Sequence, residues 1–137
     1  MRVGSCNCGG VRYKIDGPLR AVVACHCGQC RKQSGHFFAA TDAADADLTI
    51  EESGSLKWYA ASDFAKRGFC SECGSALFWK RNDSDKTSIL AGTLDGKTGL
   101  RLDRHIFAAD KGDYYELNDG LPVFDQDDSD APRPNRS

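Results

Sequence analysis

Seven cysteines fall into three tight clusters, and their spacing constrains this chain of 137 residues more than any other feature. The clusters are Cys6-Asn7-Cys8, Cys25-His26-Cys27-Gly28-Gln29-Cys30 and Cys70-Ser71-Glu72-Cys73. An odd number of cysteines does not suit a complete disulfide framework. The first residues lack the apolar core of a secretory signal, so we expect a cytoplasmic protein whose thiols stay reduced. The clusters therefore indicate metal ligands.

The first and third clusters together predict a closed zinc site with four thiolates. A C-x-x-C turn sets two thiolates at the angle that tetrahedral zinc requires, and the following residue, Gly74, can take the left-handed conformation that the turn favours. Cys6 and Cys8 are two residues apart, so in an extended segment both sulfurs point to the same face. Cys6, Cys8, Cys70 and Cys73 would saturate a zinc ion, which suits a structural role. Such an ion could contribute on the order of 10 kcal/mol to folding.

The middle cluster offers three thiolates, from Cys25, Cys27 and Cys30, and no obvious fourth ligand. Three protein ligands with an open position are typical of catalytic zinc, and that position could accept water, hydroxide or an exogenous thiolate. Two alternatives stay open. One of the chain's three histidines could close the site and make it structural, or the cysteines could be redox-active thiols without a metal.

The histidines have other interpretations as well. His26 lies between two of these cysteines, and in a strand its side chain points away from their face. We expect a structural hydrogen bond there, with a general acid or base role as the alternative. His36 and His105 lie in strand-like runs, where satisfied or exposed histidines are the expectation.

Short apolar runs predict an all-β domain. The runs often alternate and are rich in Val, Ile, Phe, Tyr and Trp. Only residues 29–34 resemble a brief helical turn, because no long stripe with a 3.6-residue period appears. The predicted strands cover residues 11–15, 19–24, 36–41, 47–50, 56–60, 67–69, 76–80, 87–91 and 104–108.

Length, charge and hydropathy fit one globular domain over residues 1–124. No apolar stretch approaches the ~20 residues that a membrane span needs. Residues 1–124 carry sixteen Lys and Arg and sixteen Asp and Glu, and this lack of a basic surplus argues against a nucleic-acid partner. Residues 125–137 hold four Asp and two Arg with no apolar anchor except one Ala, so we expect a disordered acidic tail.

The cysteine clusters and their neighbours resemble the glutathione-dependent formaldehyde-activating enzyme family, whose domain also occurs in centromere protein V. The matching motifs are Gly4-x-Cys6-x-Cys8-Gly9, Cys25-His26-Cys27-x-x-Cys30-Arg31, Gly68-Phe69-Cys70-x-x-Cys73-Gly74-Ser75-x-Leu77, His105-Ile106-Phe107 and Asp119-Gly120-Leu121-Pro122. The resemblance covers about residues 4–124. It implies an Mss4-like fold, with several small antiparallel sheets pinned by two zinc ions.

Carried over by position, the resemblance implies that Cys6, Cys8, Cys70 and Cys73 bind the structural zinc. It implies that Cys25, Cys27 and Cys30 bind a second, catalytic-type zinc.

The resemblance also implies an activity, the condensation of glutathione with formaldehyde to S-(hydroxymethyl)glutathione, which is a carbon–sulfur lyase reaction. Glutathione has two carboxylates, so Arg31 and Lys32, directly after Cys30, are the candidate substrate-binding residues. Lys66-Arg67 and Lys80-Arg81 are weaker candidates for the same role, and we expect them to be exposed strand residues instead. Two other functions are compatible with the sequence: a zinc-stabilised binding module without turnover, and a thiol-redox protein that uses Cys25, Cys27 and Cys30.

Overall fold

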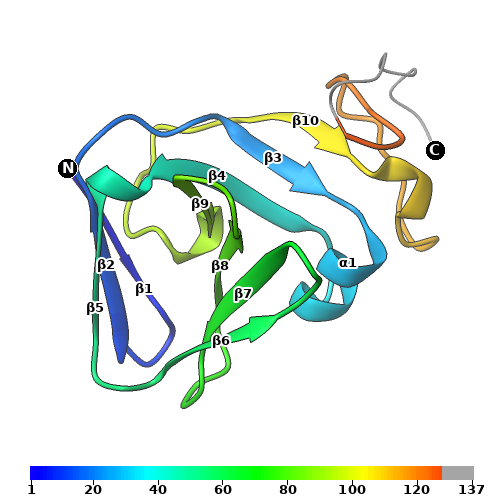
Figure 1. Cartoon of the computed structure of the whole chain (residues 1–137). Helices are drawn as coiled ribbons and strands as arrows, with labels where there is room; N and C mark the ends of the chain where they lie inside the picture. The colour runs from blue at the N-terminus through cyan, green and yellow to red at the C-terminus, as the bar shows by residue number, and fades with distance from the viewer. Residues whose placement is uncertain (128–137) are drawn as a thin grey trace. The chain divides into compact units, whose positions relative to one another are not determined.

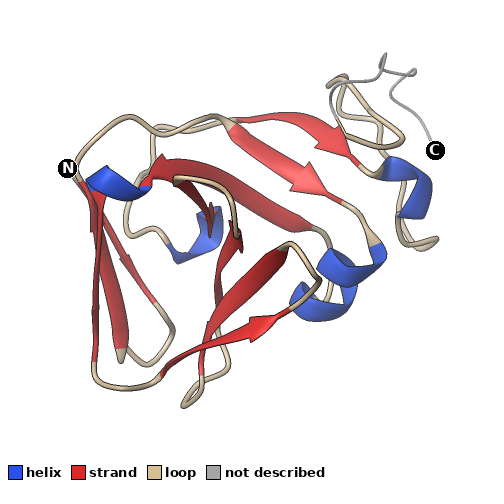
Figure 2. Cartoon of the chain, viewed as in Figure 1, coloured by secondary structure: helices blue, strands red, loops and turns tan. Residues whose placement is uncertain are grey.

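The computed structural model describes residues 1–127, so most of the predicted tail lies outside the described residues. Strands hold 43% of the residues and helices 13%, which confirms the predicted mainly β fold (Figure 2). The chain divides into two compact units. Unit 1 comprises Met1–Arg20 and Thr41–Leu100, and unit 2 comprises Ala21–Ala40 and the chain from Arg101 on. No helix in the described part of the chain is long and apolar enough to cross a membrane.

Unit 1 contains two groups of antiparallel strands (Figure 1). In the first, β2 lies between β1 and β5; in the second, β6, β7, β8 and β9 follow one another in chain order. Short 3₁₀ turns, Asp45–Asp47 and Ala91–Thr93, follow β4 (Phe38–Ala44) and β9 (Lys86–Leu90). The strands of unit 1 are β1 (Arg2–Ser5), β2 (Val11–Ile15), β5 (Leu48–Glu52), β6 (Leu56–Ala60), β7 (Ala65–Cys70), β8 (Ala76–Arg81) and β9 (Lys86–Leu90).

The core of unit 1 forms where alternating apolar side chains meet. In β2, Val11, Tyr13 and Ile15 are buried and the residues between them are exposed, which is the two-residue period of a strand with one buried face. The Tyr13 ring meets Phe78 of β8 edge to face, with ring centroids 5.5 Å apart. Cys6 belongs to the same buried cluster, so the first cysteine motif is part of the core.

Unit 2 is built around β3 (Val22–Cys25), which pairs antiparallel with β4 (Phe38–Ala44) and parallel with β10 (Leu102–Ile106). The short helix α1 (Gly28–Ser34) connects β3 to β4 and ends at Gly35, whose φ of 85° is left-handed. A second buried cluster comprises Ala108, Leu117 and Val123, with Tyr115 packed against it.

The parallel pair differs from the antiparallel sheets that the resemblance implies. A parallel neighbour requires a long connection rather than a hairpin, and the chain indeed returns beside β3 only at residue 102. The nine predicted strands correspond to β2–β10 with shifted ends, and the helical turn corresponds to α1. The sequence does not predict β1, because Gly4 and Ser5 are weak strand formers and this segment becomes a strand through its pairing with β2.

Candidate metal centres

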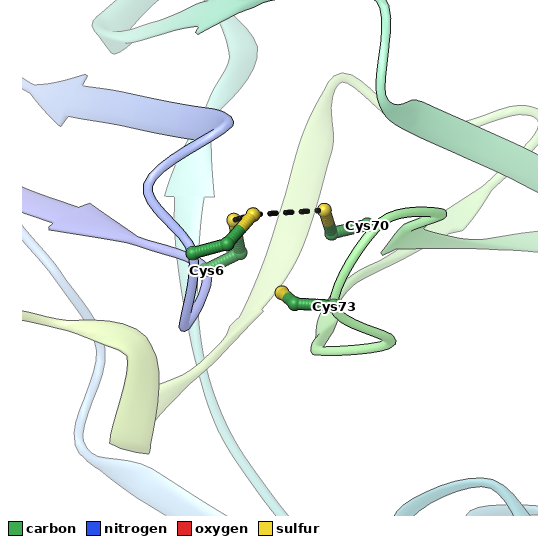
Figure 3. A group of neighbouring side chains, drawn as sticks. Cys6, Cys70 and Cys73 are labelled. Atoms are coloured by element: carbon green, nitrogen blue, oxygen red, sulfur yellow. Dashed lines mark hydrogen bonds between the residues drawn. The ribbon is translucent and has the colours of Figure 1, made fainter.

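Two turns of unit 1 bring four cysteine sulfurs together. Cys6 and Cys8 lie between β1 and β2, whereas Cys70 ends β7 and Cys73 lies in the turn to β8. Figure 3 shows Cys6 facing Cys70 and Cys73. All four sulfurs lie within 4.8 Å of one another. The Sγ atoms of Cys6 and Cys8 are 3.6 Å apart, and those of Cys8 and Cys70 are 3.7 Å apart. Tetrahedral zinc with Zn–S bonds of about 2.3 Å separates its sulfurs by about 3.75 Å, so this four-cysteine site fits zinc.

Glycines shape both turns of the four-cysteine site. Gly74 has a φ of 78° and donates its N–H to the Cys70 carbonyl at 2.8 Å, as the sequence predicts for this position. Gly9 has a φ of 79° and donates to the Cys6 carbonyl at 3.2 Å. The Cys6–Cys8 segment is therefore a turn, and not the extended segment that would place both sulfurs on one face. The turn itself converges the two sulfurs.

The electrostatics of the four-cysteine site favour a bound cation. Hydrogen bonds from the Ser75 hydroxyl and backbone lower the pKa of Cys73 to about 5. A hydrogen bond with the Gly10 backbone lowers the pKa of Cys8. The neighbouring thiol of Cys6 is among the groups that outweigh this effect and raise the pKa of Cys8 to about 12. Four adjacent thiolates repel one another, so they can all be ionised only when a cation offsets their charge.

Unit 2 brings the three remaining sulfurs together where β3 passes into α1. Cys25 ends β3, Cys27 is the N-cap of α1, and Cys30 lies in the helix. Their sulfurs also lie within 4.8 Å of one another, and the Sγ atoms of Cys25 and Cys30 are 3.3 Å apart. The Cys27 sulfur accepts a hydrogen bond from the Cys30 N–H at 3.3 Å. Cys27 therefore caps the start of the helix that carries Cys30. Within residues 1–127, no histidine or carboxylate joins this three-cysteine site.

The thiols of the three-cysteine site also oppose one another's ionisation. The pKa of Cys25 is raised, first by the neighbouring thiols of Cys27 and Cys30 and then by burial. A soft divalent cation such as Zn²⁺ would remove this penalty, and three thiolates suit it as ligands. The donor set therefore fits a metal.

The histidine between two of these cysteines points into a buried hydrogen-bonded chain. His26 is fully buried; its Nδ1 bonds to the Tyr115 hydroxyl, and its Nε2 lies 2.9 Å from Nδ1 of His105. The other ring nitrogen of His105 lies 2.7 Å from an Asp119 oxygen. Burial above all, helped by electrostatic repulsion from the neighbouring histidines, lowers the pKa of His26 to about 4. The predicted structural hydrogen bond of His26 is therefore present, and His105 is a satisfied histidine.

His36 likewise bonds to a tyrosine. Its Nδ1 lies 2.7 Å from the hydroxyl of Tyr114, on the exposed surface. Sequence reasoning did not single out Tyr114 or Tyr115. The one available signal was a pair of adjacent aromatic residues within a polar stretch.

The two cations after Cys30 are placed differently. Arg31 is half-buried, and its guanidinium lies over the first turn of α1, where a Cβ on Gly28 would be 3.7 Å from Nη2. The Nε of Arg31 is buried, and it has no hydrogen-bond partner among the described residues. Lys32 is exposed. Arg31, the residue after Cys30, therefore has an unused donor.

The sequence profile of the glutathione-dependent formaldehyde-activating enzyme family matches residues 1–110. The chain belongs to this family. An uncharacterized lyase of Schizosaccharomyces pombe is 27% identical over 126 residues, which cover 91% of each chain. A Halomonas elongata protein that carries the family's name is 29% identical over 124 residues, covering 83% of this chain and 79% of its own.

The fold of this family member is also found among solved structures. A crystal structure of a Rhodobacter sphaeroides protein superposes with a TM-score of 0.56 and 24% identity, covering 71% of this chain and 91% of that chain. At this identity the likeness concerns the fold alone. The Mss4-like fold implied by the sequence motifs is confirmed.

Proposed function

We propose that this family member is a zinc-dependent enzyme of the carbon–sulfur lyase type that forms S-(hydroxymethyl)glutathione from glutathione and formaldehyde. Membership of the family and the lyase name of the yeast relative support an enzyme that handles a glutathione-linked aldehyde. The observation that carries the proposal is the three-cysteine site, which gathers three thiolates with no fourth described ligand. A reduced, cytoplasmic setting would supply both the thiolates and glutathione.

The two sites have different roles in this proposal. Cys6, Cys8, Cys70 and Cys73 saturate a structural zinc, because four thiolates leave no position for a substrate. The three-cysteine site holds the second zinc and leaves one position open.

The reaction is an addition to a carbonyl. The glutathione sulfur loses its proton and forms a bond to the formaldehyde carbon, the π pair of the carbonyl moves to oxygen, and that oxygen takes up one proton to become the hydroxyl of the product. A zinc ion in the three-cysteine site would supply a position where an incoming thiol is held as its thiolate. The three cysteines would hold the ion and leave that position free.

Arg31 is the residue that we assign to a glutathione carboxylate. Guanidinium groups bind carboxylates in a bidentate manner, and the buried Nε of Arg31 lacks a partner. Lys32 is more exposed and would contribute a weaker, screened attraction.

Native mass spectrometry of the full chain with glutathione tests the proposal, because it counts zinc ions and bound thiol together. We expect two zinc ions and one glutathione per chain, with the glutathione lost in Cys30→Ser. Formation of the adduct from ¹³C-formaldehyde is followed by NMR in the same samples. A chain with two zinc ions and no bound glutathione would contradict the proposal. It would favour an enzyme with another substrate or a binding module without turnover.

One observation favours a second candidate, a thiol-redox protein. The sulfurs of Cys25 and Cys30 are only 3.3 Å apart, so a mild oxidant could join them. Forming that disulfide removes two protons and two electrons and would release a metal from the site. Loss of 2 Da together with one zinc after oxidised glutathione is added would support this function.

A further inference from the structure

We infer that Tyr115, His26, His105 and Asp119 form a clasp that positions the ligands of the three-cysteine site. The inference rests on the metal role proposed for that site, and it concerns how this chain holds its own ligands in place. The residues of the clasp belong to unit 2 but lie up to 93 positions apart in the sequence.

The clasp is a continuous run of hydrogen bonds whose two central residues are buried. His26 and His105 are 0% and 2% exposed, and their ring centroids are 5.1 Å apart. Tyr115 closes one end by bonding to His26, and Asp119 closes the other end by bonding to His105. Every ring nitrogen of the two histidines thus has a partner, as buried polar groups require.

The donors and acceptors of the clasp are assigned by following it from its charged end. A carboxylate can only accept, so His105 donates from Nε2 to Asp119. With both imidazoles neutral, Nδ1 of His105 then accepts from Nε2 of His26, and Nδ1 of His26 accepts from the Tyr115 hydroxyl. Each partner therefore fixes the tautomer and the ring orientation of the next.

The backbone around both histidines is fixed as well. His26 donates its N–H to the Ile106 carbonyl at 3.0 Å, which extends the pairing of β3 with β10 past Cys25. His105 donates its N–H to the Pro122 carbonyl at 2.9 Å and accepts from the Phe124 N–H at 2.8 Å. The clasp is therefore attached to a sheet rather than to a free loop.

The clasp acts on the metal ligands through the peptide between them. Cys25 and Cys27 flank His26 directly, so the hydrogen bonds that hold the His26 side chain also restrain the backbone that joins the two cysteines. Tyr115 is itself held, because Lys111 donates to its carbonyl at 2.6 Å and its ring packs on Ala108, Leu117 and Val123. Partners that orient ligand-bearing groups commonly raise metal affinity by an order of magnitude or more.

Competition between the zinc-loaded full chain and a chromophoric chelator tests the clasp, with native mass spectrometry reporting which species has lost one ion. In Tyr115→Phe the ring and its packing stay while the donor to His26 is lost. We expect the chelator to remove the first zinc at about tenfold lower concentration than in the wild type. Cys30→Ser identifies that zinc as the one from the three-cysteine site.

The neighbouring tyrosine is the matched control. Tyr114→Phe removes a hydroxyl that bonds to His36 at the surface, so zinc release should match the wild type. A second pair tests the far end: Asp119→Ala should weaken zinc retention, whereas Asp119→Asn keeps an acceptor oxygen and should restore most of it. Thermal unfolding of all variants shows whether the effect exceeds a general loss of stability.

Three outcomes separate the possibilities. Early zinc release in Tyr115→Phe and Asp119→Ala, but not in Tyr114→Phe, supports the clasp. Unchanged release in both of the first two variants overturns the clasp while leaving the proposed function intact. A wild-type chain that holds one zinc only overturns the metal role of the three-cysteine site, and the clasp with it.

Discussion

Gly4 has no Cβ, and this allows β1 to pack closely over the core of unit 1. A Cβ on Gly4 would collide with the Tyr13 hydroxyl and with the Thr93 carbonyl oxygen. Tyr13 cannot move aside easily, because its ring is 1% exposed and its hydroxyl is 2.6 Å from the Thr93 hydroxyl. We predict that Gly4→Ala lowers the free energy of unfolding by about 1–3 kcal/mol, measured by urea denaturation. Gly92→Ala, where no heavy atom lies within 4 Å of the added Cβ, is the control.

Asp42 allows a prediction about pH. Burial opposes its ionisation, but hydrogen bonds from Arg20 (3.0 Å) and Ser88 (2.7 Å) outweigh burial and hold the pKa of its carboxyl below the usual 3.8. Because the pKa of Asp42 is lower in the folded chain, its carboxylate stabilises the fold fully above pH 3.8. This stabilisation is lost only as the pH falls through the folded-state pKa. We predict that Asp42→Asn costs about 1 kcal/mol, discounted for partial exposure, and that urea denaturation gives the same cost at pH 7 and pH 5. A cost that halves at pH 5 would contradict this assignment.

At the scale of elements, the turn between β7 and β8 and the helix α1 carry cysteines with different consequences. Zinc bound to the four-cysteine site would contribute on the order of 10 kcal/mol, as much as the whole stability of a typical domain. We predict that Cys73→Ser yields an unfolded chain by near-ultraviolet circular dichroism. Cys30→Ser should stay folded with one zinc and no affinity for glutathione.

The comparison between these two variants is the decisive part. Both variants replace a thiol with a hydroxyl. A difference in folding between them therefore reflects the site that has lost its cysteine, because the substitution itself is the same. If Cys30→Ser unfolds as completely as Cys73→Ser, the division into a structural and a catalytic-type site is wrong.

At the scale of the whole molecule, each compact unit contains one cysteine site. Protons compete with the metal for thiolates, and a site with three protein ligands loses this competition before a site with four. We predict that, as the pH falls, the first zinc leaves while circular dichroism stays native, and that the second zinc leaves together with the fold. Parallel acid titrations followed by native mass spectrometry and circular dichroism check this order. Simultaneous loss of both ions would show that the sites are not independent.

Short-range features of the fold could be predicted from the sequence. Spacing indicated that Cys6 and Cys8, and likewise Cys70 and Cys73, converge within each motif, and the predicted group of four is found in the structure. The strands from β2 on follow from alternation and composition, which act over a few residues. Arg67 shows the limit: it is 2% exposed where an exposed residue was predicted, because β7 has neighbours on both sides and directs Arg67 to the same face as the buried Ala65.

The sequence by itself determined the class of fold, the two groups of cysteines and the family. Only the tertiary structure decided which residues surround those cysteines. Tyr115 reaches His26 across 89 positions, and β10 joins β3 in parallel after a connection that no local pattern encodes. The physical reason is that such partners are selected by long-range strand pairing and by the need to satisfy buried polar groups, both of which exist only once the chain has folded.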